Sequence, residues 1–369
     1  MKVGIFTMHK VLNYGSALQA YALQHVVEKL GCYCEIIDYQ YPPVVKEKKI
    51  KRLIFSVFSF FKECLIGFPL KRKQKKFLEF YDNFFNLSPN SYNRNTIRTE
   101  YPAYDIYLSG SDQVWNPRFI KDDFNFLLAF VPDGRKKIAY SSSFATSEIP
   151  DELKEKYLFY LKRFDKIAVR EANSVNLVKQ IVGMDADAVC DPVLLMKKEE
   201  WDCLATKSNM KEDEPYILAY VLGYMFNPWP QIDDIIKKIQ SKLGYRVIYL
   251  VGRKEDFLKR NSKLIKDAGP LDFLYLFQNA KFVITTSFHG AAFSALFEVP
   301  FYGVVKDKKD NGDRIVNLLE SLRLPEAIVN FDENIEFSES AILRLKVTKE
   351  SLNNFRNHSL NILNDEIRC

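Results

Sequence analysis

Three side chains that can bind anions or move protons follow short apolar runs, at the places where buried strands would end. His289 stands between the run 281–288 and the small residues 290–292, so it lies where a strand gives way to a helix. A histidine beside the free amides of a helix start can bind an anion while it transfers a proton. A purely structural histidine is commoner in proteins, but this position favours a catalytic one.

The other two side chains are Arg170, which closes the run 165–169, and Asp112, which lies in a polar loop after another run. A guanidinium at the carboxyl edge of a sheet presents five donors in a rigid fork that suits a carboxylate or a phosphate. A surface ion pair with Glu171 or a nearby aspartate is the alternative for Arg170. We predict Arg170, Asp112 and His289 as the catalytic residues.

The polar loop 109–117 holds further candidates for substrate binding. Ser109 and Gln113 lie in this loop with Asp112, and its small residues leave room for a ligand. An Asx turn that only stabilises itself is the alternative interpretation. Ser142 belongs to a serine cluster without the G-x-S-x-G context of a nucleophile, so we assign it to substrate binding rather than to covalent catalysis.

Asn13, Gly15 and Ser16 lie between the first strand pattern and a helical pattern over 16–30. Gly15 permits close backbone approach, Ser16 can cap the helix, and the first helical amides can hold an anion. An ordinary turn with a capping serine explains the same residues. Neither a G-x-G-x-x-G nor a G-x-x-x-x-G-K-[ST] phosphate loop occurs in the chain.

Metal ligands do not form a recognisable pattern in the sequence. Asp185 and Asp187 have the D-x-D spacing of metal-dependent glycosyltransferases, but they precede a short strand without a nearby third ligand, which favours a solvated loop. The close pair Cys32 and Cys34 matches neither a zinc knuckle nor a C-x-x-C motif. We therefore expect no metal site and no cofactor.

Short runs rich in Val, Ile, Tyr and Phe alternate with longer amphipathic stretches, which is typical of parallel sheets with crossover helices. Strands are expected at 3–7, 35–38, 105–108, 137–140, 166–169, 216–222, 246–251, 282–286, 301–305 and 327–329. Helices are expected at 16–30, 198–205, 229–243, 290–297 and 349–364. The predicted fold class is α/β, with two Rossmann-like doubly wound domains facing a central cleft.

The domain division is predicted near residue 195, where polar and charged residues accumulate. Residues 1–195 would form the first domain and residues 196–345 the second, with the helix 349–364 packing back onto the first. Ligands of such folds lie beyond the carboxyl ends of the strands. The cleft between the two sheets is therefore the expected site.

Positive charge is concentrated in one segment. The formal net charge is +6, yet residues 46–76 alone hold eleven Lys or Arg and two Glu, so a general nucleic-acid-binding surface is not implied. The aromatic run 53–61 is too short to span a membrane. Its basic flanks resemble an interfacial helix for an anionic membrane, and a helix packed on its own domain is the alternative.

The scattered cysteines and the absence of a signal-peptide pattern at Met1 lead us to expect a cytoplasmic protein. If the segment 46–76 binds lipid, the protein would lie at the inner face of the membrane.

Five motifs, taken together and in this order, resemble the polysaccharide pyruvyl transferase family over roughly residues 1–330. They are Asn-Tyr-Gly-Ser-Ala-Leu-Gln at 13–19, Ser-Gly-Ser-Asp-Gln-Val-Trp-Asn-Pro at 109–117, Ala-Val-Arg-Glu at 168–171, Cys-Asp-Pro at 190–192 and Ser-Phe-His-Gly at 287–290. Each motif is weak alone, and the ordered set is specific for the family.

The resemblance implies a glycosyltransferase-B-like pair of domains, with the acceptor on the first and the donor on the second. It also implies phosphoenolpyruvate as the donor, whose pyruvyl group becomes a cyclic ketal on a sugar with loss of phosphate. Arg170 would hold one anionic group of the donor, and His289 with the amides at Gly290 would hold the other and supply the acid. Asp112 would orient or deprotonate an acceptor hydroxyl.

One position departs from some branches of the family, which carry an arginine where Ser287 stands. Lys306 or Arg314 would then compensate as the donor-binding cation.

The predicted function is transfer of a pyruvyl group from phosphoenolpyruvate to a sugar of a cell-surface or capsular polysaccharide precursor, such as a lipid-linked oligosaccharide. A metal-independent nucleotide-sugar glycosyltransferase of the same fold is an alternative. A non-catalytic, membrane-peripheral member of the family is another.

Overall fold

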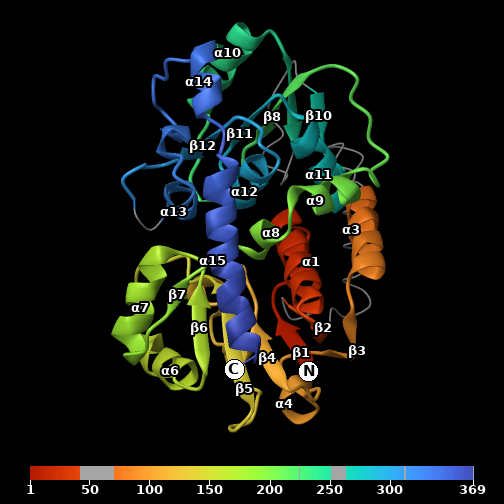
Figure 1. The fold of residues 1–369 in the computed structure, drawn as a ribbon, viewed down its shortest axis with the longest axis vertical. Coiled ribbons are helices and arrows are strands. Elements are labelled where there is room, and N and C mark those ends of the chain that lie inside the picture. Colours follow the sequence, from red (N-terminus) through yellow and green to blue (C-terminus); the bar gives the residue numbers. More distant parts are fainter. Residues whose placement is uncertain (42–69, 224, 251–262, 311–312, 369) are drawn as a thin grey trace, which may run out of the picture.

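Two parallel β-sheets, each covered by helices on both faces, form the two lobes of the protein (Figure 1). The computed structural model describes residues 1–41, 70–223, 225–250, 263–310 and 313–368. Within these ranges the first lobe holds a seven-stranded sheet of order β3-β2-β1-β4-β5-β6-β7, and the second holds a six-stranded sheet of order β10-β9-β8-β11-β12-β13. The predicted fold of two doubly wound Rossmann-like domains is confirmed.

The strands of each lobe pair in parallel throughout. In the first lobe they are β1 (Lys2–Phe6), β2 (Tyr33–Tyr39), β3 (Leu87–Tyr92), β4 (Ile106–Ser109), β5 (Lys136–Ser142), β6 (Lys166–Val169) and β7 (Asp187–Ala188). In the second they are β8 (Tyr216–Tyr220), β9 (Arg246–Leu250), β10 (Lys263–Ile265), β11 (Phe282–Thr285), β12 (Phe301–Val305) and β13 (Ile328–Asn330). The central strands β8, β11 and β12 are buried along their whole length, as strands covered on both faces must be.

Helices connect these strands and cover the sheets. The first lobe has α1 (Tyr14–Lys29), α3 (Leu70–Phe84), α4 (Thr96–Thr99), α5 (Pro117–Ile120), the 3-10 turn η1 (Phe124–Leu127), α6 (Asp151–Leu161), α7 (Ala172–Val182) and α8 (Pro192–Leu195). After α8 come α9 (Lys198–Ala205), α10 (Ile232–Leu243), α11 (Pro270–Asn279), α12 (Phe288–Leu296), α13 (Arg314–Ser321), the turn η3 (Pro325–Ala327), α14 (Glu339–Arg344) and α15 (Lys349–Arg368).

The sequence patterns missed three strands, β3, β7 and β10, each at or near a sheet edge. β3 has the polar sequence Leu-Ser-Pro-Asn-Ser-Tyr with three exposed residues in the middle, which is the composition of a loop. Pairing with β2 through the main chain makes it a strand, and a search for apolar runs does not detect such pairing.

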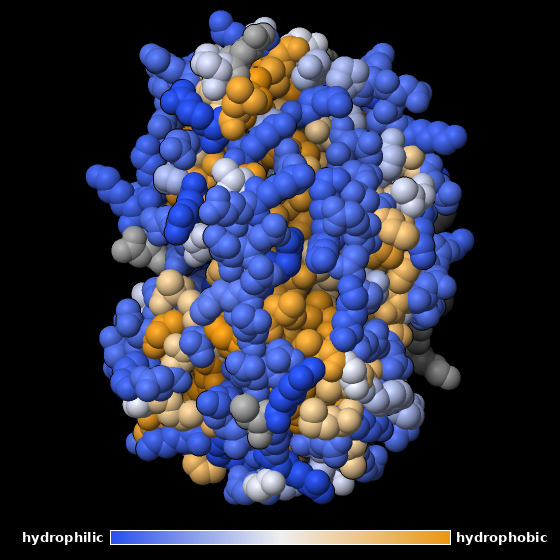
Figure 2. All heavy atoms as spheres, viewed as in Figure 1, coloured by the Kyte–Doolittle hydropathy of each residue, from blue (hydrophilic) through white to orange (hydrophobic). Residues whose placement is uncertain are grey.

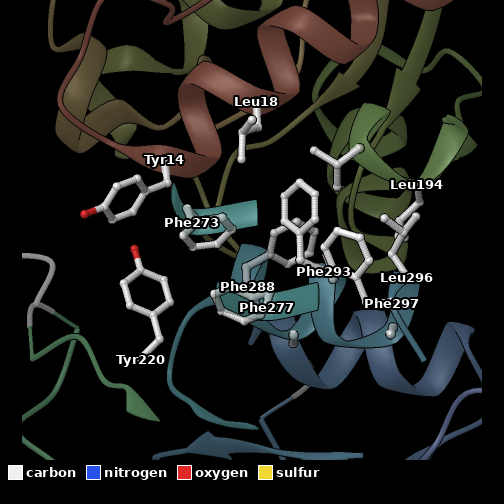
Figure 3. Packing of buried hydrophobic residues seen from close by; sticks show 14 of the residues in the cluster. Tyr14, Leu18, Leu194, Tyr220, Phe273, Phe277, Phe288, Phe293, Leu296 and Phe297 are labelled. Carbon is white, nitrogen blue, oxygen red and sulfur yellow. The ribbon is translucent and has the colours of Figure 1, made fainter. Parts of the chain in front are cut away.

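The two lobes share one hydrophobic core rather than meeting across a wet interface. Tyr14 of α1 stacks on Phe273 of α11, with ring centroids 5.0 Å apart, and Phe273 contacts Phe293 of α12 edge-on (Figure 3). Figure 3 shows Leu18 of α1 and Leu194 of α8 directed at the same aromatic group. The first turns of α1 and α12 are therefore held close together by apolar packing.

The last helix, α15, crosses from the second lobe to the first (Figure 1). Ser359 accepts a hydrogen bond from the Cys190 amide at 2.9 Å, and the Arg356 guanidinium donates to the Leu194 carbonyl at 2.6 Å. Because these contacts lie beside α8, the C-terminal helix braces the chain between the lobes. The exact domain boundary at 195 stays a prediction.

The face that carries α15 is mostly hydrophilic, with hydrophobic side chains showing between the polar ridges (Figure 2). No helix in the described ranges is long and apolar enough to cross a membrane. Of the basic segment 46–76, only residues 70–76 are described, at the start of α3. The proposed membrane contact of residues 46–69 lies outside the described residues.

Glu366 on α15 supplies a test of the packing of this helix. The side chain is buried, and one of its carboxylate oxygens has no hydrogen-bond partner among the described residues. Burial, together with nearby Asp187, raises the pKa of Glu366 from 4.5 to about 8. Between these values the folded protein keeps a proton that the unfolded chain has released, so stability falls as pH rises.

We expect Glu366→Gln to stabilise the protein at about pH 8 and to bring no gain below about pH 4.5. The gain should be roughly 1–3 kcal/mol, because the neutral amide needs no proton uptake. Urea denaturation across this pH range measures it. The exposed Glu155 on α6 gives the control Glu155→Gln, for which no such pH-dependent gain is expected. A gain for Glu366→Gln that does not change with pH would contradict the burial argument.

Candidate active site

His289 lies at the contact between the two lobes, against the first turn of α1. A Cβ atom added to Gly15 would lie 2.0 Å from the His289 Nδ1 atom and 2.3 Å from its Cγ atom. The imidazole therefore packs directly on the backbone of α1, and only glycine leaves room for it. This contact brings together two of the residues predicted from the sequence, one from each lobe.

Asp191 links His289 to Arg170. Its Oδ2 atom accepts hydrogen bonds from Arg170 Nη1 and from the Ser111 hydroxyl, both at 3.0 Å. The same oxygen lies 3.5 Å from His289 Nε2. The other oxygen, Oδ1, caps α8 by accepting the Val193 amide at 3.1 Å. A single buried carboxylate thus joins a guanidinium of the first lobe to an imidazole of the second.

The pKa of Asp191 lies well below its usual range. Burial opposes ionisation, but the charges of His289 and Arg170 and the hydrogen bond from the Val193 amide outweigh it. Asp191 is therefore ionised when both partners are in place, and it can hold them in position.

Arg170 is buried, with 6% of its surface exposed. Its Nε atom donates to Glu171 at 3.0 Å, and its guanidinium carbon lies 4.3 Å from the centre of the Phe288 ring, which comes from α12. The ion pair with Glu171 considered from the sequence is thus present, but it is buried rather than on the surface.

Two buried nitrogens of this cluster, Arg170 Nη2 and His289 Nε2, have no hydrogen-bond partner within the described ranges. Buried polar groups are normally satisfied by protein, water or a ligand. These two nitrogens, with His289 Nε2 3.5 Å from Asp191 Oδ2, are therefore candidates for contact with a ligand.

Asp112 is held in a conformation that few non-glycine residues adopt, with φ of 76°. Its Oδ2 atom accepts the Ser16 hydroxyl at 2.5 Å, and its Oδ1 atom accepts the Gln113 amide at 2.8 Å. A parallel β-bridge joins it to Ser142. A residue keeps such a strained conformation only where the surrounding structure holds it in place. Residues of this kind occur preferentially at functional sites.

The starts of α1 and α12 differ from the sequence prediction. The cap of α1 is Asn13, whose side chain accepts the amides of Gly15 and Ser16, so the predicted capping role of Ser16 is wrong. At α12 the Ser287 side chain accepts the Gly290 amide. The amides expected to hold an anion are occupied at both helices, because side chains at the N-cap positions reach them first. The amides of Gly15, Ser16 and Gly290 are therefore not free to hold an anion.

The remaining candidates divide into structural and accessible positions. The hydroxyls of Ser109 and Ser142 are buried and donate to main-chain carbonyls, which ties together neighbouring strands and turns. Gln113 lines a cleft between the lobes. Arg314 lines a second cleft, whereas Lys306 is exposed after β12 and is absent from the described lining of both clefts.

The first cleft, called here the aromatic cleft, has a volume of about 280 Å³. Its lining includes Tyr14, Ser16, Tyr41, Asp112, Gln113, Phe119 and Tyr220. The second, called here the arginine cleft, has a volume of about 260 Å³. Its lining includes Arg118, Thr146, Thr286, Phe288, Asp313 and Arg314. Both clefts draw residues from both lobes, and the neighbours Arg118 and Phe119 place α5 between them.

Sequence reasoning missed Asp191, Arg118 and Phe288 as members of the site. Asp191 precedes Pro192 at a helix start, a pattern that predicts a cap and explains only one of its two oxygens. Phe288 lies in the Ser-Phe-His-Gly motif at 287–290, which marks its position but not its contact with Arg170. The place of Arg118 in the cleft depends on how the lobes pack.

Solved structures confirm the fold class. The putative UDP-N-acetylglucosamine 2-epimerase of Listeria monocytogenes superposes with a TM-score of 0.55 at 12% identity, covering 100% of this chain and 95% of that one. UDP-GlcNAc 2-epimerase of Neisseria meningitidis, bound to UDP-GlcNAc, gives 0.51 at 13% identity, with 100% and 99% covered. At such identities the similarity defines the fold alone, a two-domain GT-B fold.

A search of curated proteins found no match in sequence. The chain belongs to the polysaccharide pyruvyl transferase family, because the model of that family matches residues 13–307. The match spans α1, the loop with Asp112, the Arg170–Asp191 pair and His289, and so includes the whole inter-lobe cluster.

The contact between Gly15 and His289 predicts that Gly15→Ala destabilises the protein by roughly 1–3 kcal/mol, because the new methyl group overlaps the imidazole. Helix propensity alone predicts the opposite sign at a helical glycine. Urea denaturation measures the difference. Gly223→Ala is the control, since a Cβ there meets nothing within 4 Å, and its effect should stay within about 0.5 kcal/mol. Equal or higher stability of Gly15→Ala would contradict the contact.

Proposed function

We propose that this protein transfers the pyruvyl group of phosphoenolpyruvate to a sugar as a cyclic ketal and releases phosphate. The observation that carries the proposal is the pair of unpartnered buried nitrogens, Arg170 Nη2 and His289 Nε2, held beside one carboxylate where the lobes meet. Membership of the polysaccharide pyruvyl transferase family supports the reaction class.

The donor carries a carboxylate and a phosphate on a three-carbon enol, so its site needs cations at two places. Arg170 Nη2 and His289 Nε2 would bind one anionic group. The arginine cleft next to Phe288 would receive the other, with Arg314 and Arg118 as the cations. Asp313 also lines this cleft, but its carboxylate is engaged by the amides of Ile315 and Val316. Asp310 lines it as well, so cation and carboxylate charges are balanced before the donor binds.

The reaction has four steps. The methylene carbon of the enol takes a proton, one sugar hydroxyl attacks the neighbouring carbon, and the carbon–oxygen bond to phosphate breaks. A second hydroxyl then captures the oxocarbenium ion and loses its proton to the departing phosphate or to a base. The protonated His289 would supply the acid.

Asp191 acts as a positioning residue in this scheme. It orients both the guanidinium of Arg170 and the imidazole of His289 without needing to contact substrate. Asp112 would receive the proton of the attacking hydroxyl, since its carboxylate lines the aromatic cleft on the other side of α5. The Ser16 hydroxyl fixes that carboxylate in place.

The acceptor would be a cell-surface or capsular polysaccharide precursor, and a lipid-linked oligosaccharide fits the basic segment 46–76 of the sequence. A cytoplasmic location with contact at the inner face of the membrane, and turnover without a metal or cofactor, stay predictions. A nucleotide-sugar glycosyltransferase of this fold would need a carboxylate for the ribose and a pocket for the base.

The test incubates the full chain with phosphoenolpyruvate and lipid-linked glycans, then measures the added pyruvyl mass and the released phosphate. His289→Gln should lower the rate by about 100-fold or more, because the acid and one anion contact are both lost. His358→Gln is the matched control, since His358 is exposed on α15, and it should leave the rate unchanged.

Thermal stabilisation separates the alternatives. Phosphoenolpyruvate should raise the melting temperature of the wild type, and nucleotide sugars should not. Stabilisation by nucleotide sugars alone would favour the glycosyltransferase. Binding of phosphoenolpyruvate with no turnover on any glycan would favour the non-catalytic family member.

A further inference from the structure

The aromatic cleft has a lining that differs in character from that of the arginine cleft. Phe119, at 43% exposure, and Tyr41 provide aromatic surface on one side. Tyr41 is fixed, because its hydroxyl donates to the Phe119 carbonyl and its ring packs edge-on against Phe126 at 5.0 Å between centroids. Leu222 and Tyr220 of the second lobe also line the cleft. A rigid aromatic wall is thus exposed inside an inter-lobe cleft.

Polar groups lie at the floor of the same cleft. Asp112 offers carboxylate oxygens, and the amide of Gln113 is oriented by Asn116, which donates to its oxygen at 2.9 Å. That bond leaves the Gln113 amide nitrogen as a donor. The Tyr14 hydroxyl is buried without a hydrogen-bond partner in the described part of the chain. Figure 3 shows the Tyr14 and Tyr220 hydroxyls directed toward the same side of the interface.

Charge distinguishes the two clefts. The described lining of the aromatic cleft contains no lysine or arginine, and its one ionisable acid is Asp112. An anionic ligand there would lie beside the Asp112 carboxylate, and no cation in the described lining would offset the repulsion between the two negative charges. A ligand with hydroxyls on one edge and an apolar face on the other meets no such penalty.

We propose that the aromatic cleft binds one uncharged pyranose ring of the acceptor, with its apolar face on Phe119 and its hydroxyls on Asp112 and Gln113. The inference rests on the proposed function, and it adds that the pyruvylated sugar is neutral rather than a uronic acid. The volume of about 280 Å³ suits a single ring, since it lies just below the range of roughly 300–1,000 Å³ that is typical of ligand pockets.

The test is saturation-transfer difference NMR on the full chain with neutral methyl hexopyranosides and, separately, methyl glucuronoside. Transfer to ring protons is expected for at least one neutral hexoside and not for the uronoside. Phe119→Ala should lower the affinity for the neutral sugar about tenfold, and Phe119→Trp should retain binding. Phe159→Ala is the control, because Phe159 is 62% exposed on α6.

Equal binding of the uronoside, no binding of any neutral hexoside, or unchanged affinity in Phe119→Ala would each overturn the inference. Circular dichroism of Phe119→Ala verifies that the fold is retained. No phosphoenolpyruvate is present in this experiment, so its outcome is independent of pyruvyl transfer. A failure of the transfer assay with sugar binding intact would reject the proposed reaction and leave the sugar site standing.

Discussion

A buried negative charge at the junction of two lobes is the constraint on which the site depends. Asp191 is fully enclosed, and a carboxylate in such a place must be compensated. Arg170 from the end of β6 and His289 from the start of α12 provide the compensation. Because one partner comes from each lobe, docking of the lobes adds the His289 imidazole to a carboxylate that Arg170, Ser111 and Val193 of the first lobe already contact.

Apolar packing holds the lobes in this arrangement. The aromatic side chains of α11 and α12 meet α1 in one continuous core, and Gly15 lets the imidazole sit against the helix. The clefts on either side of α5 then differ in their charged groups: arginines of both lobes with two aspartates line one, and aromatic rings with a single carboxylate line the other. A reaction that joins an anionic donor to a polyhydroxylated acceptor needs two such environments beside one acid.

The sequence predicts those residues of the candidate site whose positions follow from local patterns of apolar and polar residues. The sequence identifies His289, Arg170 and Asp112 as candidates for the site. Parallel strands end at one edge of a sheet, so a polar residue that follows an apolar run is expected at that edge. The Cys-Asp-Pro motif at 190–192 marks the position of Asp191, but its local pattern predicts only a helix cap and not the contacts with Arg170 and His289. The occupied amides of α1 and α12 were also missed, since Asn13 and Ser287 compete for them through side-chain geometry. Contacts between lobes, such as Phe288 on Arg170, arise from packing that no local pattern encodes.

The central claim is that His289 binds the anionic donor where the lobes meet, and NMR of the protein labelled with ¹⁵N-histidine tests it most directly. The chain has four histidines, and the signal lost in His289→Gln identifies the one of interest. The account predicts that phosphoenolpyruvate, added without acceptor, shifts the ring nitrogen signals of His289 and leaves those of His25 and His358 in place. An unchanged His289 signal at saturating phosphoenolpyruvate would contradict it.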